Sequence, residues 1–140
     1  MQLGKENWRT FERGIEKEWL LANGIGGYAS STVIGANTRR YHGLLVASLN
    51  PPVERHLVLS KIDETIMIGD ESYNLYSFRT PDYTMEGFKY QQRFINDPLP
   101  VFIYNVEDVF VEKKVTMVYG ENTVAIVYRI INGSRGLKLR

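Results

Sequence analysis

The side chains that could do chemistry gather in one short segment, Asn37–Gly43, which reads Asn-Thr-Arg-Arg-Tyr-His-Gly. Its amide, guanidinium and imidazole groups can exchange hydrogen bonds with hydroxyl groups, and its tyrosine ring offers a flat apolar face. These are the properties by which proteins bind neutral polyols such as sugars. No acidic residue occurs between Trp19 and Val53, and Arg39 and Arg40 carry the only full charges there.

A purely structural role for this segment competes with sugar binding. One arginine would then pair with Glu16 or Glu18 on a neighbouring strand, while the other arginine lies in solvent. An exposed ion pair of that kind contributes little to stability. The residue types alone favour this structural role. The candidate residues under both interpretations are Asn37, Arg39, Arg40, Tyr41 and His42.

A second segment, Asn23–Ala29, is rich in glycine and formally contains the Gly-x-Gly-x-x-Ala pattern of dinucleotide-binding proteins. That pattern requires a following helix, whose N-terminus receives the pyrophosphate. Here Ser30–Gly35 favours a strand, and the acidic residue expected about 20 positions later is missing from Leu44–Leu49. We therefore reject nucleotide binding and interpret the segment as a turn between strands. Its candidate residues are Asn23, Gly24, Gly26, Gly27 and Tyr28.

Other catalytic and metal-binding patterns are weak. His42 and His56 are the only histidines, and neither has a second ligand at a short spacing. The sequence lacks a Gly-x-Ser-x-Gly nucleophile motif. Adjacent acids such as Asp63-Glu64 sit beside turn signals and would point to opposite faces of a strand. We expect no metal site and no cofactor.

The elements that must position these segments are strands. Apolar and polar residues alternate along most of the chain, between clusters of Gly, Asn, Asp and Pro. The expected strands are Ile15–Ala22, Tyr28–Ile34, Tyr41–Leu49, Arg55–Ile62, Thr65–Ile68, Ser72–Phe78, Phe88–Ile95, Val101–Val106, Val109–Tyr119 and Thr123–Ile131. Asn132-Gly133 predicts a hairpin turn that leads into Leu137–Leu139, and only Asn7–Gly14 could hold a helical turn. About ten short strands at this spacing predict an all-β, antiparallel β-sandwich with little helix.

Composition agrees with an ordinary globular domain. The 140 residues include 17 Lys and Arg, 16 Asp and Glu, and no Cys. A net charge of +1 gives no attraction for nucleic acid or an anionic membrane, and no apolar run approaches the roughly 20 residues that span a bilayer. We expect one domain in the cytoplasm. Aromatic residues make up 12% of the chain, and we expect those on strands to fill the core, including Phe102, Tyr104, Tyr119 and Tyr128.

Both candidate segments also carry a family resemblance. The stretch Glu18–Ser30 and its continuation through Gly35–Ala47, Asn50–Arg55 and Leu59–Glu64 resemble the N-terminal domain of archaeal and bacterial glycogen debranching enzymes, the amylo-α-1,6-glucosidases. One departure is Ser31, where that family more often has glycine. From about Ser72 onward the resemblance rests on strand pattern and length.

The resemblance implies a β-sandwich of the super-sandwich type that precedes a catalytic (α/α)-barrel. The barrel would hold the general acid and general base that hydrolyse α-1,6-glucosidic branch points of glycogen or another α-glucan. Residues 1–140 would then be the N-terminal piece of a larger enzyme and inactive alone, with no catalytic residue of their own. Their partners would be the catalytic domain of the same polypeptide and the glucan.

The resemblance also leads to an expectation for the two candidate segments. We expect the Gly24–Gly27 turn and Asn37–His42 to lie side by side on one edge of the sandwich and to face the barrel. Arg39, Arg40 and His42 would complete the interdomain contact or touch glucan. Two alternatives stay open: an autonomous glucan-binding sandwich, and a structural domain that never meets sugar.

Overall fold

The alternating sequence folds almost entirely into β-strands. The structure is a computed structural model, and it describes residues 1–131 and 136–140. Within that range, helical structure is confined to the helix α1 (Phe11–Gly14) and two 3₁₀ turns, Lys5–Asn7 and Gly87–Lys89. The helix begins where the Thr10 hydroxyl accepts a hydrogen bond from the backbone N–H of Arg13, as N-cap residues do.

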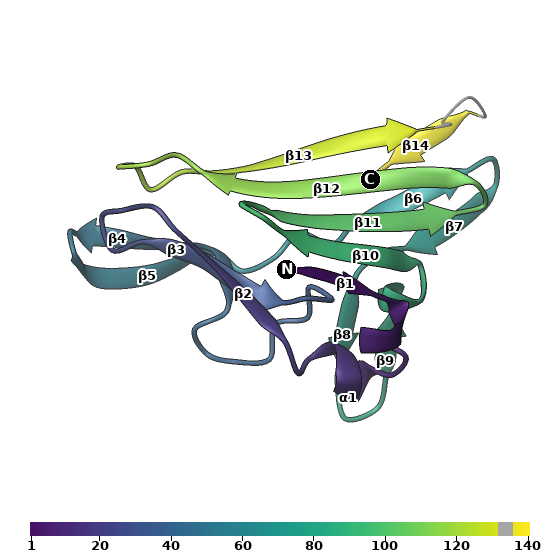
Figure 1. Ribbon diagram of the computed structural model, residues 1–140, viewed down its shortest axis with the longest axis horizontal. Coiled ribbons are helices and arrows are strands. Elements are labelled where there is room, and N and C mark those ends of the chain that lie inside the picture. The colour runs from purple at the N-terminus through teal and green to yellow at the C-terminus, as the bar shows by residue number, and fades with distance from the viewer. Residues whose placement is uncertain (132–135) are drawn as a thin grey trace.

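One layer of the molecule is a five-stranded antiparallel sheet in the order β1-β10-β11-β12-β13 (Figure 1). Its strands are β1 (Gln2–Gly4), β10 (Gln91–Asn96), β11 (Pro100–Val106), β12 (Val109–Met117) and β13 (Val124–Ile131). The first strand of the chain therefore pairs with a strand from its second half, and Leu3 lies opposite Phe94.

The facing layer consists of two smaller antiparallel sheets. The four-stranded sheet contains β2 (Glu18–Ala22), β3 (Tyr28–Thr32), β4 (Gly43–Asn50) and β5 (Val53–Leu59), in that order. The three-stranded sheet has β6 (Thr65–Ile68) between β14 (Leu137–Leu139) and β7 (Glu71–Asn74). A two-stranded hairpin, β8 (Ser77–Arg79) and β9 (Thr84–Glu86), extends from this layer.

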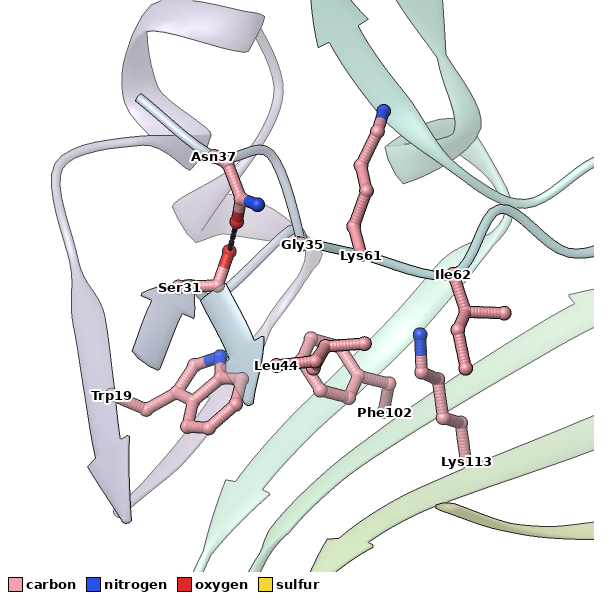
Figure 2. A pocket seen from close by; sticks show the side chains of 9 residues that line it. All are labelled: Trp19, Ser31, Gly35, Asn37, Leu44, Lys61, Ile62, Phe102 and Lys113. Carbon is pink, nitrogen blue, oxygen red and sulfur yellow. Dashed lines mark hydrogen bonds between the residues drawn. The ribbon is translucent and has the colours of Figure 1, made fainter. Parts of the chain in front are cut away.

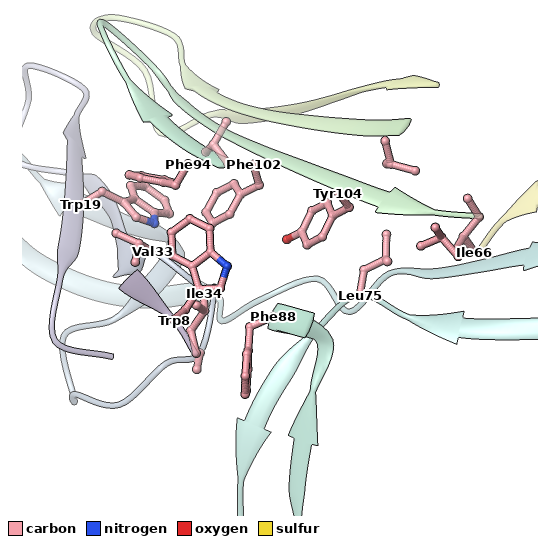
Figure 3. Close-up of a cluster of buried hydrophobic side chains, with 14 of the residues drawn as sticks. Trp8, Trp19, Val33, Ile34, Ile66, Leu75, Phe88, Phe94, Phe102 and Tyr104 are labelled. Atoms are coloured by element: carbon pink, nitrogen blue, oxygen red, sulfur yellow. The ribbon is translucent and has the colours of Figure 1, made fainter. Parts of the chain in front are cut away.

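The core lies between the two layers (Figure 3). Every second residue of β11 is buried, which is the period of a strand with one face on the core. Phe102 of β11 meets the Trp19 ring from the four-stranded sheet and the Phe94 ring of β10, both edge to face. Ile66 of β6 belongs to the same buried cluster, so one continuous core joins all three larger sheets.

A buried ion pair also connects the layers. Lys113 of β12 lies 2.5 Å from a carboxylate oxygen of Glu64, which immediately precedes β6. The Tyr128 hydroxyl of β13 donates to the same oxygen at 2.5 Å. Both charged side chains are almost completely buried, so each depends on the other for its partner.

The predicted all-β sandwich is confirmed, with differences at individual elements. The predicted strand Ser72–Phe78 is divided between two strands, β7 and β8. The chain leaves the three-stranded sheet at Leu75, whose backbone N–H donates to the backbone carbonyl of Glu64, and then enters the β8–β9 hairpin. The short strands β1 and β9 were not predicted. Tyr119 was expected in the core, and this prediction is wrong. The residue lies beyond the end of β12 and is 85% exposed.

The end of the described chain also differs from expectation. The predicted turn at Asn132-Gly133 lies outside the described residues. The strand that follows it, β14, exists, but it pairs with β6, with Leu137 opposite Ile68. Outside residues 132–135, no helix is long and apolar enough to span a membrane.

Candidate functional site

The loop that connects β3 to β4 is built around His42. The imidazole Nδ1 accepts hydrogen bonds from the backbone N–H groups of Thr38, at 2.9 Å, and Arg39, at 3.1 Å. A nitrogen that accepts two such bonds carries no proton, so the ring proton lies on Nε2. His42 is buried, and its Nε2 points to the Glu18 carboxylate, 2.5 Å away. The histidine is thus a structural centre of the loop.

Glu18, on β2, accepts hydrogen bonds from three side chains of this loop. Its carboxylate accepts from His42, from the Arg39 guanidinium at 2.8 Å and from the Tyr41 hydroxyl at 3.3 Å. Burial by itself raises the pKa of Glu18, but the hydrogen bonds from Arg39 and His42 and the positive charge of Arg39 outweigh it and lower the pKa. The carboxylate therefore stays ionised at neutral pH, and it is unsuited to the role of a general acid.

Asn37 anchors the other end of the loop. Its side chain donates to the Ser60 carbonyl oxygen at 2.9 Å and accepts from the Ser31 hydroxyl at 2.7 Å (Figure 2). Ser31 therefore supplies a hydrogen bond that a glycine at this position could not. The cavity beside this bond has a volume of about 20 Å³. That volume holds about one water molecule and excludes a sugar.

Arg40 differs from its neighbours. Its side chain is exposed and makes no ion pair with any residue of the described chain. Arg39 pairs with Glu18, while Arg40 lies in solvent. This is the arrangement of the structural alternative considered above, and it leaves one cation of the segment available to a partner.

The glycine-rich segment between β2 and β3 is organised by Asn23. Its buried side chain accepts from the N–H groups of Ile25 and Gly27 and donates to the Glu121 carbonyl and to Asn122 Oδ1. All four hydrogen-bonding positions of the amide are thereby used. Asn23 closes its own turn and fixes the turn to the β12–β13 hairpin tip of the other layer.

Two glycines of this turn make close approaches. Gly26 has φ of +98°, and a Cβ there would lie 2.5 Å from the carbonyl oxygen of Pro52. Gly24 has φ of +84°, and a Cβ there would meet the ring of Tyr119. Asn122 bonds to the Ser48 backbone on both sides, so the ends of β4 and β12 also meet here. The turn is therefore a packed junction between the two layers.

The two candidate segments lie at opposite ends of β3 rather than side by side. The Asn23–Gly27 turn precedes this strand and the 33–42 loop follows it. Their link is the Tyr28 hydroxyl, which donates to the Tyr41 carbonyl at 2.8 Å. The first segment is also held by β5, because the Arg55 guanidinium donates to the Gly26 carbonyl at 2.7 Å.

Between these segments, the outer face of the four-stranded sheet forms an open groove. Tyr28 and Tyr41 supply two aromatic rings, and Leu20, which is 64% exposed, supplies an aliphatic side chain. Glu18 and Arg55 supply opposite charges at the same groove. The groove unites residues from all four strands or their ends. Of the predicted residues, Tyr28 and Tyr41 line the groove. His42 and Arg39 support it through their contacts with Glu18. The loops around the groove are held by Asn23, Gly24, Gly26, Gly27 and Asn37.

Sequence reasoning did not include Glu18, Arg55 and Asn122 among the candidate residues. The sequence indicates Glu18 only as a possible partner for an arginine. Its position two residues before exposed Leu20, on the same face of a strand, is a signal that could have placed it beside the groove. No local pattern marks Asn122, because its partners lie far away in the sequence.

Comparison with known proteins supports the resemblance found in the sequence. A search of curated proteins and a search of solved structures each gave no match. A family model described as "Glycogen debranching enzyme N terminal" matches residues 17–140, which include both loops and the groove. The chain therefore belongs to the family of glycogen debranching enzyme N-terminal domains.

Proposed function

We propose that this chain is a non-catalytic domain of an enzyme that hydrolyses α-1,6-glucosidic branch points of glycogen or a similar α-glucan. The domain packs against the catalytic domain of the same polypeptide and helps to shape its active site. Such hydrolysis uses two carboxyl groups, one of them a general acid with a raised pKa. In this proposal both belong to the catalytic domain, in agreement with the lowered pKa of Glu18.

The observation that carries the proposal is the groove lined by Tyr28, Tyr41 and Leu20. Half-exposed aromatic and aliphatic side chains on a sheet face indicate a surface that another molecule or domain covers. The groove residues are held by the packed loops on either side, so the surface is preformed. A preformed surface loses less conformational entropy when a partner covers it.

Arg40 is the residue most available for contact with that partner. It is exposed and unpaired within the described chain, next to Arg39 and Tyr41, which the Glu18 carboxylate holds. A guanidinium can donate to a carboxylate of the catalytic domain or to the hydroxyl groups of a glucan. Arg40 therefore makes the interdomain or glucan contact in this proposal.

The test is Arg40→Ala in a debranching enzyme that carries this domain. We expect a lower kcat/KM for branched glucan, a lower Tm, or both. Arg129→Ala is the matched control, because Arg129 is an exposed arginine on β13, in the other layer. If Arg40→Ala and Arg129→Ala give the same kcat/KM and the same Tm, Arg40 does not make the proposed contact.

A second candidate function is an autonomous glucan-binding module. Two tyrosine rings beside charged hydrogen-bonding groups in one groove favour it, since aromatic faces and polar side chains together bind sugars. Titration calorimetry of the 140-residue chain with malto-oligosaccharides decides between the two functions. Binding that Tyr41→Ala abolishes supports the module. No heat of binding, together with an effect of Arg40→Ala in the enzyme, supports the interdomain role.

A further inference from the structure

A second groove lies where the N-terminal segment meets the 3₁₀ turn Gly87–Lys89. Lys5, Trp8 and Arg9 line one side of it, and Phe88 and Lys89 line the other. Three of these five residues are basic and none is acidic. Its volume of about 550 Å³ falls within the range of small-molecule sites.

The floor of this groove is rigid. The Trp8 indole N–H donates to the Gln91 carbonyl at 3.0 Å, and the backbone N–H of Phe88 donates to the Ser77 hydroxyl at 3.0 Å. Both rings are almost completely buried, so they define the shape of the floor and offer little stacking area. A ligand would therefore be held mainly by the basic side chains at the rim.

The charges at the rim are largely uncompensated. Lys5 and Arg9 are exposed and form no ion pair with any described residue, whereas Lys89 pairs with Glu86 at 3.1 Å. The nearest acid in sequence, Glu6, lines a different groove, where its carboxylate lies against Gly4. The groove thus carries about two net positive charges on a chain whose total net charge is only +1.

We propose that this groove binds a phosphate group, either free or as the monoester of a small molecule. A phosphate dianion matches the net charge of the rim, and Arg9 can donate to two of its oxygens at once. The volume exceeds that of one anion, which leaves room for the body of an ester. Lys5, Trp8 and Arg9 precede residue 17, where the family match begins, so the groove is built partly outside the matched region.

The test is a series of NMR titrations of the 140-residue chain, which observe its backbone amides. The probes are inorganic phosphate, glucose 6-phosphate and glucose. We expect both phosphates to shift the amides of residues 5–9 and 88–91, and glucose to shift none of them. Tighter binding of glucose 6-phosphate than of inorganic phosphate identifies an ester as the ligand, while equal binding identifies the free anion.

Variants establish where the phosphate binds. The double variant Lys5→Gln/Arg9→Gln should bind at least about tenfold more weakly, because it removes charge-assisted hydrogen bonds. Lys138→Gln, an exposed lysine on β14, is the matched control and should bind as the parent does. Absence of phosphate binding, equal weakening by the control, or binding that the double variant leaves unchanged would each overturn the proposal. Lys5, Arg9 and Lys138 are all exposed, so we expect each variant to keep the Tm of the parent. Measuring the Tm therefore checks that the variants fold.

Discussion

At the scale of single residues, the most consequential side chain is the Glu18 carboxylate. One carboxylate on β2 fixes the imidazole of His42, the guanidinium of Arg39 and the hydroxyl of Tyr41. The His42 ring in turn holds the backbone of Thr38 and Arg39. The conformation of the whole β3–β4 loop therefore depends on a charge that lies outside the loop.

Replacing Glu18 with glutamine tests this dependence. We expect Glu18→Gln to lower the free energy of unfolding at pH 7 by about 1–2 kcal/mol, since charge-assisted hydrogen bonds become neutral ones. The pKa of Glu18 is lowered in the folded state, so its stabilisation is present above the ordinary value of 4.5 and is lost as pH falls below it. The difference between parent and variant should therefore shrink from pH 7 to pH 3.5 in urea denaturation.

Glu16→Gln is the control for this measurement. Glu16 is exposed, and its carboxylate lies 3.8 Å from Arg13, a pair that contributes little. We expect a change of less than about 0.5 kcal/mol at either pH. If the two variants behave alike, Glu18 is not the organiser of the loop.

At the scale of elements, the turn between β2 and β3 shows how a glycine can be required for two separate reasons. Gly26 has a positive φ and also lies against the Pro52 backbone, whereas Gly35 has φ of +77° with open space around it. Gly26→Ala should lose stability both from backbone strain and from the clash. Gly35→Ala should lose only the strain contribution, about 1 kcal/mol.

Thermal unfolding of both variants separates the two causes. We expect a clearly larger fall in Tm for Gly26→Ala than for Gly35→Ala. Equal falls in Tm would mean that the β4–β5 hairpin, which contains Pro52, can move away from Gly26 without a loss of stability. The packed junction described above would then be loose.

The buried pair between β12 and the start of β6 provides a test of how the layers are joined. Lys113→Met leaves the Glu64 carboxylate buried without its partner charge, and we expect a loss of about 3–5 kcal/mol. The triple variant Lys113→Met/Glu64→Leu/Tyr128→Phe removes every polar member of the cluster. It should recover most of that loss in urea denaturation. A triple variant as unstable as the single one would show that the ion pair itself is favourable.

Much of the element order was predictable, because it follows local patterns. The strand β11, for example, is rich in β-branched and aromatic residues between turn-forming residues, and its aromatic residues Phe102 and Tyr104 are buried as expected. The pairing of β1 with β10 was not predictable, since a three-residue strand has no period and its partner lies in the other half of the chain. For Glu18, the sequence indicates a possible arginine partner, but its contact with the His42 ring was not predictable, because the two residues are distant in sequence.

At the scale of the whole molecule, the exposed edge of the four-stranded sheet stands out. On β5, Val53, Leu57 and Val58 are 55%, 54% and 60% exposed. The strand lies at the end of the sheet order and pairs only with β4 among the described strands. An exposed apolar edge strand can pair with another chain.

We therefore expect the 140-residue chain to associate with itself as its concentration rises. Val58→Lys should suppress this association, because a lysine on an edge strand opposes edge-to-edge pairing. Lys138→Gln serves again as a distant surface control. Sedimentation velocity over a range of concentrations measures the effect, and a chain that stays monomeric throughout would contradict the expectation.

The sheet order also determines how this chain can fold. Gln2 pairs with Ile95, and Leu137 pairs with Ile68, so neither terminal strand has a partner near it in sequence. Such distant pairings form late, because the entropy of closing a long loop must be lost before their contacts are made. During synthesis β1 must wait until β10 has left the ribosome, whereas the hairpins β2–β3, β4–β5 and β11–β12 join consecutive strands and can form as soon as each pair has emerged. The groove proposed to bind phosphate combines residues 5–9 with Phe88 and Lys89. It is therefore complete only after β1 has paired with β10.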